Sequence, residues 1–252
     1  RYLSRDELAP LSSYRDPACW KERFDQGRTS DRFRYRRPVA GVLHWVELNI
    51  CLFREETTQN VYALLYLKDI NAEKEREAAQ AEAARRDPLT HIYNRAAFER
   101  VVSNSILGSG EGPCGVLMLL DIDDFKRIND QHGHLEGDKA LKMVAQTLLS
   151  TFRQEDTVGR LGGDEFLVYI KGVFPRSVLE TRLKKLLSDL RSIPDASLTS
   201  SIGLTYVQND QTPYTEHLRQ ADIALYHSKR NGKDCYCFYE DLPTKSGREP
   251  AL

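Results

Sequence analysis

One segment divides the chain into two differently patterned regions. Residues 71–86, of sequence NAEKEREAAQAEAARR, contain six alanines, four glutamates and four lysines or arginines, without glycine, proline, aromatic or β-branched residues. Because these residue types favour the α-helix, the segment predicts a helical connector between two domains. An ordinary solvated helix is the alternative. The length of 252 residues allows one to two domains.

Composition indicates a globular protein. Hydrophobic residues make up 40% of the chain, and 36 basic residues nearly balance 37 acidic ones, so we expect no nucleic-acid partner from overall charge. The longest apolar runs, 61–67 and 114–120, are far shorter than the roughly 20 residues that span a bilayer. With no signal peptide and five scattered cysteines, we expect a cytoplasmic protein without a membrane segment. The missing initiator methionine suggests a fragment of a longer chain.

Strand-like alternation characterises the region before the connector. In residues 41–53 apolar side chains alternate with polar ones, which is typical of a half-buried β-strand. We expect Pro38 and Gly41 to end an earlier strand, and residues 8–23 to be partly helical. The predicted strands of this small antiparallel sheet include residues 33–35, 41–53 and 61–67.

Helical and strand patterns alternate after the connector. Gly162-Gly163, between two predicted strands, indicates a hairpin. In one predicted helix, Leu148 and Leu149 both fall at core spacing. The order of elements is typical of a mixed α/β domain with an antiparallel component. Helices are predicted over residues 96–107, 138–152, 177–190 and 214–230, and strands over 115–121, 157–160, 165–170 and 198–205.

Two acidic clusters follow apolar strands. Asp121-Ile122-Asp123-Asp124 comes at the end of strand 115–121, and Asp164-Glu165 lies in the turn after Gly162-Gly163. Carboxylates at strand ends are oxygen ligands that suit Mg²⁺, which usually takes only a few of them together with substrate phosphates. Such ions can assist phosphoryl transfer. Spacing alone leaves open that these are solvated turn carboxylates.

The residues around these clusters resemble the GGDEF-domain diguanylate cyclase family. Five motifs occur in the family's order over residues 87–252, and the signature itself is unbroken. One departure is His91, where the family commonly has glycine, outside the nucleotide motifs. The motifs are DPLTHIYNR at 87–95 with Phe98, DIDDFKRIND at 121–130, GHLEGD at 133–138, RLGGDEF at 160–166, and ADIALY at 221–226 with Lys229 and Lys233.

This resemblance implies a fold and a reaction. It implies an α/β (α+β) domain over residues 87–252 with a palm-like, ferredoxin-type βαββαβ core. The implied reaction condenses two GTP into cyclic di-GMP and two pyrophosphates in a homodimer, with Mg²⁺ or Mn²⁺ as cofactor. The rival interpretation is a non-catalytic receptor that binds cyclic di-GMP or GTP and acts through a partner protein.

The resemblance also implies roles for individual residues. Asp164 and Glu165 match catalytic positions, and Asn129 with Asp138 matches the positions that read the guanine edge. Helix and turn caps remain an alternative for that pair, as an ordinary basic helix end does for the two lysines near residue 230. The implied metal ligands are Asp121, the Ile122 carbonyl, Asp164 and Glu165, and the implied substrate-binding residues are Phe125, Lys126, Asn129, Asp138, Gly162, Gly163, Lys229 and Lys233.

A further motif lies just before the signature. Arg153 and Asp156 form an R-x-x-D pattern with five residues between it and Gly162, the spacing of the family's inhibitory product-binding site. The arginine fork can hold a phosphate or a guanine. A surface ion pair without any ligand is the alternative.

The region before the connector resembles the C-terminal half of a PAS sensor domain. The matching runs lie between Phe33 and Asn71, in a region of about 70 residues, and are less specific than the GGDEF motifs. Residues 1–70 are therefore interpreted as a partial PAS-like sensor domain that supplies a signal, residues 71–86 as the connector, and residues 87–252 as the cyclase domain.

Overall fold

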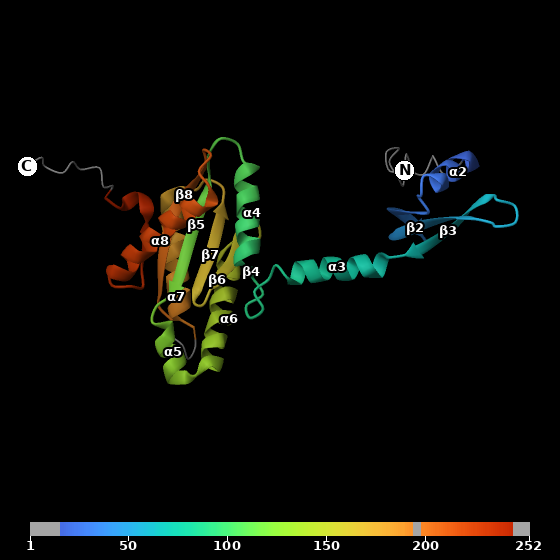
Figure 1. Cartoon of the computed structure of the whole chain (residues 1–252). Coiled ribbons are helices and arrows are strands. Elements are labelled where there is room, and N and C mark those ends of the chain that lie inside the picture. Colours follow the sequence, from blue (N-terminus) through green and yellow to red (C-terminus); the bar gives the residue numbers. More distant parts are fainter. Residues whose placement is uncertain (1–15, 194–197, 244–252) are drawn as a thin grey trace, which may run out of the picture. The chain divides into compact units, whose positions relative to one another are not determined.

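A computed structural model describes residues 16–193 and 198–243. The chain separates into two compact units, residues 1–83 and 84–252 (Figure 1). The division falls within the predicted connector, at the end of helix α3 (Asn71–Ala83). This helix stops three residues before the predicted end at residue 86. No helix among the described residues is long and apolar enough to cross a bilayer.

The first unit contains the predicted antiparallel sheet. Its strands β1 (Ser30–Val39), β2 (Val42–Arg54) and β3 (Val61–Asp69) lie in that order. Helix α2 (Pro17–Asp25) begins after Asp16, whose carboxylate accepts a hydrogen bond from the Ala18 N–H. Of the predicted helix at 8–23, residues 8–15 lie outside the described part of the chain.

The first strand ends between the two predicted residues, one position after Pro38 and two before Gly41. Pro38 lies inside β1 opposite Leu43, and the strand continues to Val39. Proline is tolerated there because β1 is an edge strand. On the open side of an edge strand no neighbouring strand needs the missing N–H. The turn follows at Ala40 and Gly41, both with positive φ.

The second unit has the predicted ferredoxin-type core. The chain order of strand, helix pair, two strands, helix and strand is βαββαβ, and its four strands occupy the middle of a six-stranded mixed sheet. The edge strands pair in parallel, and the inner ones are antiparallel. In spatial order the strands are β4 (Tyr93–Asn94), β6 (Thr157–Gly162), β7 (Glu165–Lys171), β5 (Gly112–Ile122), β8 (Ser200–Asn209) and β9 (Tyr236–Phe238).

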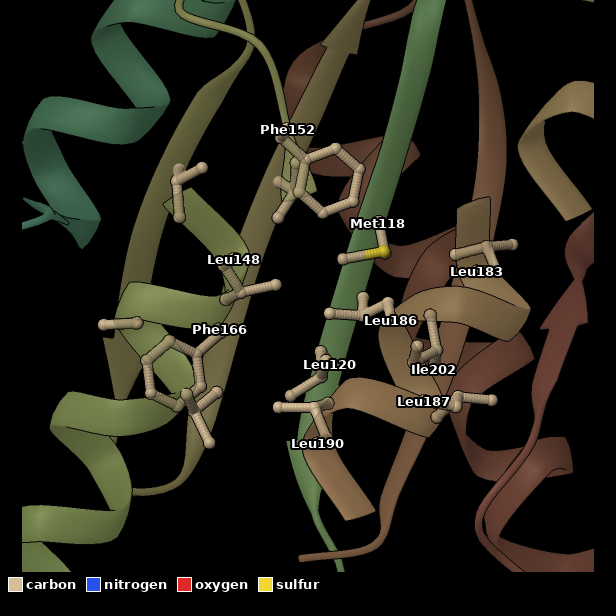
Figure 2. Close-up of a cluster of buried hydrophobic side chains, with 14 of the residues drawn as sticks. Met118, Leu120, Leu148, Phe152, Phe166, Leu183, Leu186, Leu187, Leu190 and Ile202 are labelled. Atoms are coloured by element: carbon tan, nitrogen blue, oxygen red, sulfur yellow. The ribbon is translucent and has the colours of Figure 1, made fainter. Parts of the chain in front are cut away.

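Helices cover both faces of this sheet. Helices α6 (His134–Thr151) and α7 (Arg176–Arg191) pack apolar side chains against one face (Figure 2). Helices α4 (Arg95–Leu107) and α8 (Tyr214–Arg230) cover the other face. Because both faces of β5 are covered, its residues from Cys114 to Ile122 are all buried. A continuous apolar strand is the expected consequence of such double burial.

Two short elements were not predicted. Strand β4 and the helix α5 (Phe125–His132) have two and eight residues, too few for a hydrophobic period to be readable. The expectation that Leu149 belongs to the core is wrong, since its side chain is 56% exposed. Leu148, one position earlier on α6, is fully buried, because the apolar face of this helix is narrow.

Adjacent leucines on α6 provide a matched test of the core. Leu148→Ala should lower the free energy of unfolding by about 2–5 kcal/mol, since it leaves a cavity between α6 and the sheet. Leu149→Ala should change it by less than about 1 kcal/mol. Because both tryptophans, Trp20 and Trp45, lie in the first unit, unfolding of the second unit should be followed by far-ultraviolet circular dichroism. An equal loss of unfolding free energy in the two variants would contradict this packing.

Candidate active site

Strand pairing brings the two acidic clusters together. In the antiparallel register of β5 and β7, Asp121 lies opposite Glu165. The Ile122 N–H donates to the carbonyl oxygen of Asp164 at 3.3 Å, which holds the hairpin turn against the end of β5. The alternate residues that share the face of this pair, on both strands, pack toward α4 and α8. Alternation therefore directs Asp121 and Glu165 toward the α8 side of the sheet.

The carboxylates of this cluster repel one another. Burial raises the pKa of Asp121, and the charges of Asp164 and Asp123 add to this, while Lys229 opposes it. The Lys229 Nζ atom lies 2.8 Å from Asp121 Oδ2. Burial and then the charges of Asp121 and Asp164 raise the pKa of Glu165. A cation between these groups would relieve the repulsion.

The donor set suits an ion that shares its coordination with a ligand. Within the described ranges, no three acidic, histidine or cysteine side chains are close enough to hold a metal by themselves. Mg²⁺ commonly takes one or two carboxylates and completes its shell with water and substrate phosphates. The crowded Asp121, Asp164 and Glu165 fit that requirement. The Ile122 side chain is a hydrocarbon without donor atoms, so this residue can contribute only its backbone carbonyl oxygen.

The signature turn is anchored by one arginine. Arg160 donates from Nε and Nη2 to the Gly163 carbonyl oxygen, at 3.0 and 2.6 Å, and from Nη1 to Asp87 Oδ1 at 3.1 Å. Gly163 has φ of 54°, a left-handed conformation that glycine adopts at little cost. The exposed Gly162 and Gly163 leave the backbone of the turn open to a ligand.

Asp87 is held as a carboxylate at the start of this domain. Its Oδ1 atom accepts hydrogen bonds from the Thr90 N–H and hydroxyl, at 2.8 and 2.7 Å. Partial burial favours the neutral acid, but these bonds and the Arg160 guanidinium outweigh burial and hold the pKa of Asp87 below its usual range. The first of the five motifs is thereby tied to the signature turn.

Helix packing brings Asn129 to the helix that carries Asp138. Asn129 lies on α5 and Asp138 on the first turns of α6. A Cβ atom at Gly137 would lie 1.9 Å from Asn129 Oδ1, so only glycine allows this approach. Both polar side chains are half-buried. Phe125, by contrast, packs against the main hydrophobic core, and Lys126 is exposed on the first turn of α5.

The second lysine near the end of α8 also contacts the first acidic cluster. Lys233 Nζ lies 2.7 Å from Asp124 Oδ1, and both side chains are exposed. The hydrogen bond from Lys233 lowers the pKa of Asp124, and the same hydrogen bond raises the pKa of Lys233. Together with Lys229, Lys233 places two cations beside the carboxylates.

Asp123 joins three segments of the chain by hydrogen bonds, a structural role that the sequence did not predict. Its Oδ1 accepts from the Ser201 hydroxyl at 2.7 Å, and its Oδ2 accepts from the Asp234 N–H at 3.0 Å. Its own N–H donates to the Thr199 carbonyl oxygen at 2.9 Å. Asp123 is 6% exposed. It therefore fastens the loop that carries Lys233 to the ends of β5 and β8, a role that only its buried partners reveal.

The structure separates the two residues of the R-x-x-D motif. The Asp156 side chain is fully buried, and it accepts hydrogen bonds from the Arg153 N–H at 2.9 Å and the Lys171 N–H at 3.0 Å. The Arg153 side chain is 53% exposed and lies 3.4 Å from Glu155. Arg153 is thus accessible to a ligand, while Asp156 organises the loop.

Comparison with known proteins agrees with this geometry. The family model described as "Diguanylate cyclase, GGDEF domain" matches residues 84–235. The chain belongs to the GGDEF family. The diguanylate cyclase DgcP of Pseudomonas aeruginosa is 40% identical over 166 residues, which are 62% of this chain and 24% of DgcP. This GGDEF chain spans 18% to 42% of the length of the curated cyclase relatives that it matches.

Solved GGDEF structures share the fold. The diguanylate cyclase SiaD of Pseudomonas aeruginosa, solved with its activator SiaC, has a TM-score of 0.59 and 31% identity and covers 66% of each chain. The coiled coil and GGDEF domain of DgcB from Caulobacter crescentus, in complex with c-di-GMP, has a TM-score of 0.58 and 27% identity. That match covers 66% of this chain and 93% of the DgcB chain.

Asp123 and Asp124 provide a matched test of the site's framework. Asp123→Asn should lower the free energy of unfolding by about 1–3 kcal/mol, since one amide group cannot accept from both Ser201 and Asp234 and leaves a buried donor unpaired. Asp124→Asn removes only an exposed ion pair and should cost less than about 1 kcal/mol. Urea denaturation followed by circular dichroism measures both. An Asp123→Asn variant as stable as the wild type would show that these buried bonds do not fasten the loop.

Proposed function

We propose that this chain is a diguanylate cyclase. In each half-reaction the 3′-oxygen of one GTP forms a bond to the α-phosphorus of the other, the bond to the β-phosphate breaks, pyrophosphate leaves and the hydroxyl proton is released. Two such steps give cyclic di-GMP and two pyrophosphates. The observation that carries the proposal is the opposition of Asp121 and Glu165 across β5 and β7, with Asp164 and Lys229 beside them.

The carboxylates supply the metal site and a proton acceptor. Asp121, Asp164, Glu165 and the Ile122 carbonyl would hold Mg²⁺ or Mn²⁺. When bound, such an ion lowers the pKa of a hydroxyl and offsets phosphate charge. An Asp164 carboxylate oxygen would accept the proton of the 3′-hydroxyl.

The remaining polar groups would orient GTP. Lys229, Lys233 and the exposed Lys126 would bind oxygens of the triphosphate, for which point charges are suited. The open backbone at Gly162 and Gly163 would allow the phosphates to approach closely. Asn129 and Asp138 would bind the guanine, because a carboxylate accepts from the N1–H and the exocyclic amine.

The reaction needs two copies of the chain. Each domain would bind one GTP, so two domains must face each other. A homodimer would set their effective concentration and orientation.

We propose that the region 1–70 is a partial PAS-like input domain and that residues 71–86 transmit its state to the cyclase domain at 87–252. Cyclic di-GMP bound at Arg153, in a loop organised by Asp156, would inhibit the enzyme by favouring an unproductive arrangement.

An acidic-to-alanine pair tests the proposal. Asp164→Ala should lower cyclic di-GMP formation at least about a hundredfold, since it removes both a metal ligand and the proton acceptor. Asp189→Ala, which removes an exposed carboxylate paired with Lys185 on α7, should leave the rate unchanged. Product is measured by chromatography after incubation with GTP and Mg²⁺. A wild-type chain that binds cyclic di-GMP but makes none would instead be the receptor of the rival interpretation.

A further inference from the structure

A cavity lies apart from the carboxylate cluster. It has a volume of about 510 Å³, and its wall includes Arg86, His91, Tyr93, Phe152, Arg153 and Asp156. Arg86 directly precedes the first family motif, and the other residues come from that motif, the end of α6 and the R-x-x-D loop, all within the second unit. The cavity is large enough for a substantial part of a dinucleotide.

The charges at this cavity favour an anion. The Asp156 carboxylate is buried and committed to two backbone N–H groups, and Arg182 lies 3.7 Å from it. The charged groups that border the cavity are therefore mainly the guanidinium groups of Arg86 and Arg153. The Arg86 guanidinium lies 4.3 Å from the centre of the Tyr93 ring, which fixes its plane. Arginines beside aromatic faces suit phosphates joined to planar bases.

His91 stands at this wall in a backbone conformation that histidine rarely adopts. Its φ is 60°, and the exposed side chain borders the cavity. The Asp87–His91 turn enforces this conformation, because the His91 N–H donates to the Asp87 carbonyl oxygen at 2.9 Å. A left-handed non-glycine residue costs of order 1–3 kcal/mol, and such strain is often kept where a side chain has a function.

We propose that His91 is a product-binding residue of this cavity. The imidazole donates a hydrogen bond to a phosphate oxygen of cyclic di-GMP, beside the Arg153 guanidinium. This inference rests on the proposed binding of product at Arg153 and extends that site to the first motif. Glycine would adopt this backbone conformation with less strain. The presence of histidine is therefore explained by its imidazole, which lies at the cavity where the ligand would bind.

Glycine substitution separates the side chain from the backbone. His91→Gly removes the imidazole and relieves the strain, so the variant should be at least as stable as the wild type and bind cyclic di-GMP about tenfold more weakly. The matched control is Gln211→Gly, since Gln211 is exposed and also has a left-handed backbone with φ of 73°. This control should leave affinity unchanged. Isothermal titration calorimetry of the full chain with cyclic di-GMP measures affinity, and thermal denaturation measures stability.

The Arg153→Ala variant distinguishes failure of this inference from failure of the product site. If Arg153→Ala weakens binding and His91→Gly does not, the product site stands and the role of His91 is overturned. If neither change alters affinity, or the wild type does not bind cyclic di-GMP, both proposals are wrong. His91→Asn, which tolerates the left-handed backbone and keeps a donor, should retain part of the affinity lost in His91→Gly. A His91→Asn variant as weak as His91→Gly, with Gln211→Gly also weakened, would indicate a general backbone effect and overturn the proposal.

Discussion

Antiparallel pairing between β5 and β7 determines where charge gathers in this molecule. The register that places Leu120 opposite Phe166 on one face places Asp121 opposite Glu165 on the other. A slip of one residue would turn every side chain of β5 to the opposite face, and the helices that cover both faces exclude it. The hydrophobic core therefore stabilises an arrangement of carboxylates that is unfavourable by itself. Lys229 offsets part of their repulsion.

The turn between β6 and β7 is held from a second direction. Arg160 joins the Gly163 carbonyl oxygen to the Asp87 carboxylate, and Asp87 accepts the His91 N–H through its own carbonyl. The signature turn and the wall of the cavity lined by His91 and Arg153 thus share one chain of hydrogen bonds within the domain. This chain places the proposed product site on the segment that supports the proposed catalytic turn.

Sequence patterns predicted the long elements and the acidic clusters, because hydrophobic periodicity and strand-end carboxylates are local signals. They failed where a tertiary partner decides the outcome. Leu149 is exposed because it lies just outside the stripe of buried residues on α6. The two-residue strand β4 exists only through pairing with the longer strand β6.

The candidate site shows the same limit. The resemblance named Asn129 and Asp138, but the close approach of Asn129 to α6 depends on the missing side chain at Gly137. The burial of Asp156 and the network around Asp123 depend on backbone groups far along the chain, and no spacing rule reports these.

The most direct test measures how Mg²⁺ affects nucleotide binding at the β5–β7 edge. Calorimetry with 3′-deoxy-GTP, which lacks the attacking hydroxyl, gives the affinity of wild type and Asp121→Asn with and without Mg²⁺. The account predicts that Mg²⁺ tightens binding to the wild type by about tenfold or more and that Asp121→Asn loses most of this gain. An equal gain in the two proteins would contradict a metal site built on Asp121.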